Sequence, residues 1–197
     1  MLSRQEVLDI LAEAGVLMEG HFWLTSGRHS AKYLQCARIF QDARYAVPLC
    51  GNLAEQFKED QIELVVGPAM GAVQMAYEVS RQLSVPNFFY ERENGKLTLR
   101  RGFAIQPGAR VLVVEDVVTT GGTVVEVIDL VRAAGGVVAG VGIVVDRTGG
   151  KVDFGAPIKS VISLEVESYE ADSCPLCRAG GEPPIKPGSR QLYSQTI

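Results

Sequence analysis

The chain has 197 residues, a hydrophobic share of 47% and a formal net charge of −4. This length fits a single domain with a real core, and the mildly acidic balance argues against a protein whose main partner is nucleic acid. The N-terminus lacks a long apolar run after a basic start, and no stretch approaches 18 uninterrupted apolar residues, so we expect no signal peptide, no membrane span and a cytoplasmic location.

The first predicted element is an amphipathic helix over about residues 4–14. Ser3 and Glu6 form a capping-box pattern at its start, and Gly15 ends the apolar periodicity. Residues 16–38 contain glycine and aromatic residues in short alternating pieces, which we interpret as a hairpin-like hood. A second helix is predicted over 41–58 from apolar residues at helical spacing.

From residue 62 onward, short apolar and β-branched segments alternate with helical ones. This alternation predicts βαβ units, and therefore an α/β fold with a mostly parallel sheet. Two further helices are predicted, one ending near Leu83 and one over about 123–134. The expected strands are Ile62–Val66, Asn87–Tyr90, Ala109–Glu115, Val137–Val145 and Val161–Val166.

Ligands of such sheets bind beyond the carboxyl ends of the strands. The loops of interest are therefore 67–71, 91–102, 116–123 and 146–150. Residues 91–102 form a polar and basic segment that we interpret as a loop. The tail, over about 170–197, is rich in proline and glycine, and we expect it to be irregular.

The most informative segment is the apolar strand that ends on Glu115 and Asp116, with the loop after it. Successive carboxylates on a strand alternate sides, so one can face a ligand and the other its support. Three threonines supply hydroxyl groups, two glycines let the backbone approach an anion, and the following helix start adds free N–H groups. An ordinary strand-to-helix loop is the competing interpretation, which the two acids weaken. The segment predicts a site for a phosphorylated ribose.

The run Val-Leu-Val-Val-Glu-Asp-Val-Val-Thr-Thr-Gly-Gly-Thr, from Val111 to Thr123, resembles the phosphoribosyl-diphosphate motif of type I phosphoribosyltransferases. The resemblance implies a parallel sheet flanked by helices, with a small N-terminal hood, in one domain over 1–197. It implies 5-phosphoribosyl 1-diphosphate as donor, used with Mg²⁺ that is held through substrate and water, with no direct protein ligand. The donor-binding residues would include Glu115, Asp116, Val117, Val118, Thr119, Thr120, Gly121, Gly122 and Thr123.

The acceptor is indicated by two other stretches. The sequence from Phe22 to Tyr33 resembles the hood of orotate phosphoribosyltransferases, and Asp146-Arg147 resembles that family's strand-end pair. The resemblance implies transfer to orotate, giving orotidine 5′-phosphate on the pathway to UMP. A guanidinium fork suits the orotate carboxylate. The orotate-binding residues would be Thr119, Arg147, Tyr33 and Leu34.

The segment 91–102 departs from the usual mobile loop of that family. Arg92 and Lys96 keep the basic spacing, but Glu93 stands in place of a lysine and Thr98 in place of a histidine. The resemblance implies that this loop reaches into the partner's site, and hence a homodimer with shared active sites. The catalytic residues would be Lys96, Arg92 and Asp116, and Arg92, Lys96 and Arg100 would also bind the donor.

Further features of the family pattern complete the expected site. The loop Gly67-Pro68-Ala69-Met70-Gly71 resembles the diphosphate loop, and a plain strand-to-helix turn is its alternative. In the hood, Thr25 stands where many orotate enzymes have a lysine. Two other functions remain open at this point. One is a phosphoribosyltransferase for a purine or for uracil, and the other is a donor-sensing regulator with the same fold.

A Cys-x-x-Cys pair at Cys174 and Cys177 has no assigned role in this scheme. Zinc needs four ligands, and no second cysteine pair or neighbouring histidine in the sequence completes a set. His21 and His29 are distant in the chain. We therefore interpret the pair as thiols of the tail, with a metal shared between two chains as the alternative.

Overall fold

A computed structural model describes residues 1–24 and 26–187. The chain forms two compact units, which are described separately. The first unit comprises Met1–Ala14 and Cys36–Leu164, and the second comprises Gly15–Gln35 and the segment that begins at Glu165. Thr25, the hood position where a lysine is common, lies outside the described residues, as does the end of the tail. None of the helices in the described part of the chain has the length and apolar character needed to cross a bilayer.

The first unit is built on a six-stranded sheet with the strand order β5-β4-β3-β6-β7-β8. Every neighbouring pair is parallel except β4 and β5, which are antiparallel. The predicted mostly parallel α/β fold is therefore confirmed. The strands are β3 (Leu64–Pro68), β4 (Asn87–Glu93), β5 (Lys96–Leu99), β6 (Arg110–Val118), β7 (Val137–Asp146) and β8 (Ile158–Ser163).

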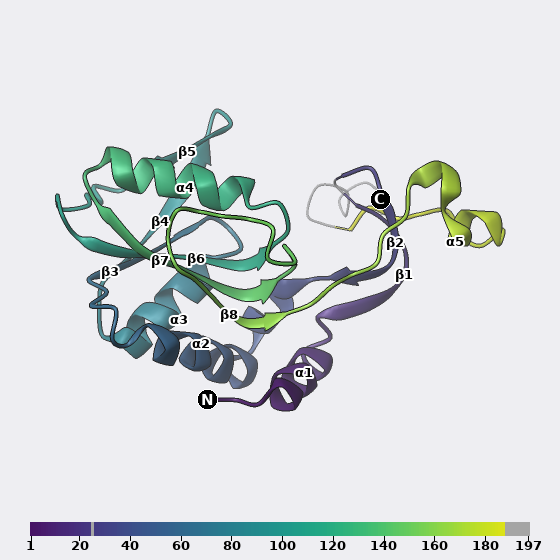
Figure 1. The fold of residues 1–197 in the computed structure, drawn as a ribbon, viewed down its shortest axis with the longest axis horizontal. Helices are drawn as coiled ribbons and strands as arrows, with labels where there is room; N and C mark the ends of the chain where they lie inside the picture. Colours follow the sequence, from purple (N-terminus) through teal and green to yellow (C-terminus); the bar gives the residue numbers. More distant parts are fainter. Residues whose placement is uncertain (25, 188–197) are drawn as a thin grey trace, which may run out of the picture. The chain divides into compact units, whose positions relative to one another are not determined.

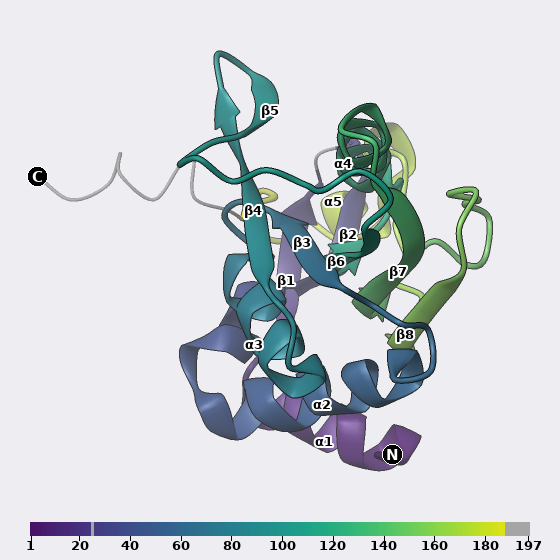
Figure 2. The same ribbon diagram turned by 90° about the vertical axis from the view of Figure 1, so that its left-hand side faces the viewer.

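Helices cover both faces of this sheet. In Figures 1 and 2, α4 (Gly122–Ala133) lies on one face, and α2 (Ala43–Phe57) and α3 (Val73–Leu83) lie on the other. The central strands are buried on both sides, which explains their nearly continuous valine and isoleucine content. The unit also contains α1 (Arg4–Glu13), with the predicted capping box, and the 3₁₀ helix η1 (Cys36–Gln41).

Several predicted boundaries in the first unit were wrong. The strand predicted to end at Glu115 runs to Val118, because Val117 and Val118 still pair with β7. Residues 91–102 are not all loop, because β4 continues to Glu93 and pairs with β5 through a two-residue turn at Asn94 and Gly95. Both turn residues have positive φ, 50° and 83°, as the Asn-Gly hairpin turn requires. The last strand begins at Ile158 rather than Val161, because its pairing with Val141 starts directly after Pro157.

The second unit contains an antiparallel hairpin of β1 (Leu17–Trp23) and β2 (His29–Leu34). The segment that begins at Glu165 carries the 3₁₀ helix η2 (Ala171–Ser173) and the one-turn helix α5 (Pro175–Arg178). Buried apolar side chains are few in the described residues of this unit: Val16, Phe22, Leu34 and Cys174. This small core leaves much of the unit's stability to other contacts.

Candidate active site

A cavity of about 530 Å³ opens in the first unit where β6 ends and α4 begins. It lies beyond the carboxyl end of the central strand, as expected for a parallel sheet. Most of the predicted donor-binding residues line it, together with parts of the 67–71 loop and one residue from β4. The lining residues are Pro68, Ala69, Gly71, Arg92, Glu115, Val117, Val118, Thr119, Thr120, Gly121, Gly122, Thr123, Val124 and Glu126.

Two buried carboxyl groups stand at the end of β6. Glu115 and Asp116 are each 9% exposed. Burial, and then the negative charge of Asp116, raises the pKa of Glu115 to about 9. Burial also raises the pKa of Asp116, although its carboxylate accepts a hydrogen bond of 2.7 Å from the Val117 N–H. Ionising both carboxyl groups in a poorly solvated place costs free energy, because two negative charges then lie close together. The pair therefore favours a nearby cation or hydroxyl donors.

The two carboxyl groups differ in what they face. Glu115 lines the cavity, whereas Asp116 faces the 67–71 loop. A Cβ added to Gly71 would lie 3.3 Å from Asp116 Oδ2. The two acids therefore have different surroundings, and their orientation on opposite sides of the strand stays a prediction.

The loop after β6 is shaped by two glycines with different functions. Gly121 has φ +78° and is the N-cap of α4, and a Cβ there would lie 2.7 Å from the Phe154 ring. At Gly122 a Cβ would meet nothing within 4 Å. No side chain among the described residues caps this helix, so its first N–H groups are available to an anion. Thr119, Thr120 and Thr123 are exposed around this helix start.

The 67–71 loop contributes another part of the cavity wall. Gly67 is packed so closely that a Cβ would lie 2.7 Å from Ala72 Cβ and 3.1 Å from the Val114 carbonyl oxygen. A glycine is therefore required for the start of α3 to approach β6. Pro68, Ala69 and Gly71 line the cavity, which supports the interpretation of this segment as part of the site.

Arg92 reaches the cavity from β4, where it is held by two partners. Its Nη2 atom lies 2.9 Å from Glu126 Oε2, and its Nη1 atom donates to the Gly95 carbonyl at 2.8 Å. Glu126 also accepts a hydrogen bond of 3.0 Å from the Leu97 N–H, and this bond is the main reason that its pKa is lowered. The hairpin is thus tied to α4 through one carboxylate.

Glu126 is a site residue that sequence reasoning missed. Thr123 and Glu126 have the spacing of a capping box, but the N-cap of α4 is Gly121 and the glutamate binds the β4–β5 hairpin instead. The sequence signal was present but indicated a different contact. The Asn94-Gly95 turn was the other missed signal, and it would have predicted the hairpin.

Several predicted site residues do not line this cavity. Lys96 starts β5 and is exposed, and Arg100 lies 3.4 Å from Glu93 and 3.8 Å from Glu91. Arg147 follows β7, where its N–H donates to the Val118 carbonyl at 2.8 Å and so fixes it beside the end of β6. Asp116 is also absent from the lining, although both of its chain neighbours line the cavity. Tyr33 and Leu34 belong to β2 in the second unit.

Comparison with known proteins gives a consistent result. A family model for the phosphoribosyl transferase domain matches residues 40–173. Proteins named orotate phosphoribosyltransferase from Desulforamulus reducens and a Thermoanaerobacter species are 50% and 54% identical over 191 residues, which is 97% of this chain and all of each relative. The crystal structure of orotate phosphoribosyltransferase from Aeropyrum pernix has a TM-score of 0.66 and 27% identity, and the match covers 80% of this chain and 93% of that one.

Proposed function

Since this chain belongs to the orotate phosphoribosyltransferases of the phosphoribosyl transferase family, we propose that the cavity at the end of β6 performs that family's reaction. The 5-phosphoribosyl group moves from 5-phosphoribosyl 1-diphosphate to orotate, and the products are orotidine 5′-phosphate and diphosphate. The observation that carries the proposal is that the buried Glu115, which is next to the buried Asp116, lines the same cavity as an uncapped helix start.

The donor's 5′-phosphate binds at the start of α4. The backbone N–H groups after Gly121 and the hydroxyl groups of Thr119, Thr120 and Thr123 surround the open space beside Gly122. A helix N-terminus favours a bound anion because its N–H groups lack partners and carry partial positive charge. The ribose hydroxyls then lie toward Glu115 and Asp116, whose carboxylates accept their hydrogen bonds.

The acid pair also fits the Mg²⁺ ion that accompanies the donor. Two buried carboxyl groups with raised pKa values ionise readily only when a cation compensates them. Glu115 and Asp116 would hold the ion through water and the sugar hydroxyls, as Mg²⁺ keeps much of its hydration shell. When bound, the ion supplies positive charge that stabilises the departing diphosphate.

The chemical step is displacement at C1 of the ribose. The bond from C1 to the diphosphate oxygen breaks, and N1 of the deprotonated orotate forms the new bond. Arg92 lines the cavity and is placed to stabilise the leaving group. A cation 4 Å from a developing negative charge contributes about 4 kcal/mol at an effective dielectric constant near 20. Arg147 orients the acceptor by pairing with its carboxylate.

The proposal extends to a homodimer with shared sites. Lys96 is exposed and does not line the cavity of its own chain, so its catalytic charge is better placed to serve a second copy. Arg100 follows on the same hairpin. Hybrid dimers test this: mixing the Lys96→Ala and Glu115→Gln variants should restore about a quarter of wild-type activity, because half of the dimers carry one intact site in a two-fold assembly. No recovery on mixing would refute sharing.

We also place the enzyme in the cytoplasm. None of the four cysteines forms a disulfide, which suits a reducing compartment. Fractionation of cells that express the untagged chain tests this placement.

The reaction itself is tested by following the loss of orotate absorbance in the presence of donor and Mg²⁺. We expect orotate consumption that depends on all three components and produces diphosphate in equal amount. Parallel reactions with uracil, hypoxanthine and adenine test the other acceptors. Turnover of any of these bases without turnover of orotate would overturn the assignment, and donor binding without any turnover would favour the regulator.

A further inference from the structure

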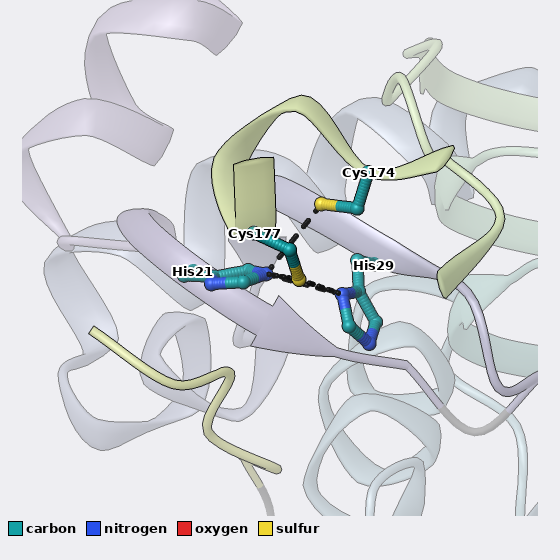
Figure 3. A group of neighbouring side chains, drawn as sticks. All are labelled: His21, His29, Cys174 and Cys177. Atoms are coloured by element: carbon teal, nitrogen blue, oxygen red, sulfur yellow. Dashed lines mark hydrogen bonds between the residues drawn. The ribbon is translucent and has the colours of Figure 1, made fainter. Parts of the chain in front are cut away.

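Four side chains of the second unit direct metal-ligating atoms toward one point. They are His21, His29, Cys174 and Cys177 (Figure 3), and one ligand atom from each lies within 4.8 Å of the others. The group contains both histidines of the chain and two of its four cysteines. The expectation that no histidine completes a set with the Cys-x-x-Cys pair was wrong, since residues distant in sequence meet in the fold.

Four of the six distances among these ligand atoms have the lengths expected around a tetrahedral ion, and all six are within 4.8 Å. His21 Nε2 lies 3.1 Å from His29 Nδ1, 3.6 Å from Cys174 Sγ and 3.7 Å from Cys177 Sγ, and Cys177 Sγ lies 3.3 Å from His29 Nδ1. Bond lengths of about 2.05 Å to nitrogen and about 2.3 Å to sulfur give tetrahedral edges of about 3.3 Å for N–N and about 3.6 Å for N–S. The four measured distances agree with these edges within about 0.3 Å.

The hairpin places both histidines on one face. Trp23 is directly opposite His29 across β1 and β2, and His21 is two residues from Trp23 on the same strand. Residues two apart on a strand share a face. His21 lies within a register shift between Glu19 and Phe22, and its ring still meets the His29 ring edge-on. Their ring centroids are 5.0 Å apart.

The C-terminal segment brings the cysteines to the same face. Tyr169 and His29 exchange backbone hydrogen bonds of 2.8 Å and 2.7 Å at β2. Ile185 is bonded on both sides at β1, donating to the His21 carbonyl at 2.9 Å and accepting from the Trp23 N–H at 2.8 Å. The segment is therefore attached to β2 at Tyr169 and to β1 at Ile185. The one-turn helix α5, which begins after Cys174 and includes Cys177, lies between these two attachments.

Contacts around the cluster orient its ligands. His21 Nδ1 lies 2.9 Å from the Glu182 carbonyl oxygen, so that nitrogen carries the proton and Nε2 presents its lone pair to the cluster. Metal-bound histidines are commonly fixed by such a hydrogen bond. His29 is 8% exposed and Cys174 is 1% exposed, so half of the ligand set is shielded from water.

We propose that the second unit binds one Zn²⁺ ion through His21 Nε2, His29 Nδ1 and the sulfur atoms of Cys174 and Cys177. The protein fills all four positions, which is typical of structural zinc rather than catalytic zinc. Binding releases the two thiol protons and involves no redox change. The described residues of the unit include few buried apolar side chains. The ion would stabilise the unit by cross-linking its hairpin to its C-terminal segment.

The metal content of the full-length protein tests this proposal. The protein should be prepared without a histidine tag, dialysed against a weak chelator and analysed by mass spectrometry for metals. We expect about one zinc per chain in the wild type and less than about a tenth of that in a Cys174→Ser/Cys177→Ser variant, because a closed site depends on all of its ligands. Cys50→Ala is the matched control, since it removes a buried cysteine outside the cluster and should leave the zinc content unchanged.

Cobalt substitution reports the ligand set directly. Replacing zinc with Co²⁺ should give the intense visible absorption of a tetrahedral ion and a thiolate charge-transfer band, and Cys177→Ser should weaken that band. Cys177 is exposed, so this single change separates loss of the metal from misfolding. A strong chelator should lower the melting temperature of the wild type but not that of the double variant.

Three results would overturn the proposal. One is a folded wild type that contains no zinc and takes up neither Zn²⁺ nor Co²⁺. Another is zinc that stays bound when both cysteines are replaced. The third is a metal-free protein in which peptide mass spectrometry finds a disulfide between Cys174 and Cys177, which would identify a redox pair instead.

Discussion

Replacing Glu115 with glutamine tests the chemistry of the acid pair through stability, independently of turnover. In the unfolded chain this carboxyl group ionises near its ordinary value of 4.5, whereas in the folded protein its pKa is about 9. Between these pH values the folded state binds more protons than the unfolded state. The free energy of unfolding should therefore fall as pH rises, by up to about 1.4 kcal/mol per pH unit for one proton.

The expected size follows from that slope. From pH 5 to pH 7.5 the wild type should lose up to about 3 kcal/mol through this group. Glutamine cannot ionise, so the variant should be more stable than the wild type by a similar amount at pH 7.5 and nearly equal to it at pH 4.5. The stabilised variant should nevertheless lose orotate turnover, because glutamine cannot supply the carboxylate that the site uses. Replacing a functional residue often raises stability while it lowers activity.

Chemical denaturation at a series of pH values, without donor or divalent cation, measures the difference. Glu59→Gln is the matched control, because Glu59 is exposed on the surface and its replacement should leave the pH dependence unchanged. If Glu115→Gln and the wild type keep the same difference in unfolding free energy at every pH, the buried-acid argument is refuted.

Four further changes test other parts of the site. Gly122→Ala places a methyl group in the open space beside the helix start and should weaken donor binding at least about tenfold in calorimetric titration while unfolding changes by less than about 1 kcal/mol. Gly121 has φ +78°, and a Cβ there would lie 2.7 Å from the Phe154 ring, so Gly121→Ala should instead destabilise the fold by about 1–3 kcal/mol. Equal effects of the two substitutions on donor binding and on stability would contradict the separate roles of the two glycines. Glu126→Gln breaks its ion pair with Arg92, in which both side chains are more than a third exposed, so the free energy of unfolding should fall by less than about 1 kcal/mol. The KM for the donor should fall, because Arg92 is released to bind it. A higher KM for the donor would contradict the role of Arg92 in donor binding. Arg147→Met should raise the KM for orotate by about 30-fold or more through loss of a charged hydrogen bond, with the donor KM unchanged, and a matching rise for the donor would remove Arg147 from acceptor binding.

The strand, loop and helix start that line the cavity were predictable from the sequence because they are local. Glu115, the loop and the start of α4 are consecutive in the chain, and the residue types needed to turn a strand into a helix around an anion identify themselves by spacing alone. The strongly apolar strand before them also fixed the fold class, since a strand buried on both faces requires helices on both sides.

The tertiary structure decided which distant groups meet. The pairing of Arg92 with Glu126 depends on β4 lying two strands away from β6 in the sheet, and no local pattern encodes it. The same is true of His21 and Cys174, which are 153 positions apart in the chain, although His21 Nε2 lies 3.6 Å from Cys174 Sγ. A single sequence gives distances along the chain, whereas a ligand set depends on distances in space. Here the backbone hydrogen bonds of Tyr169 and Ile185 with the hairpin bring the cysteines to the histidines.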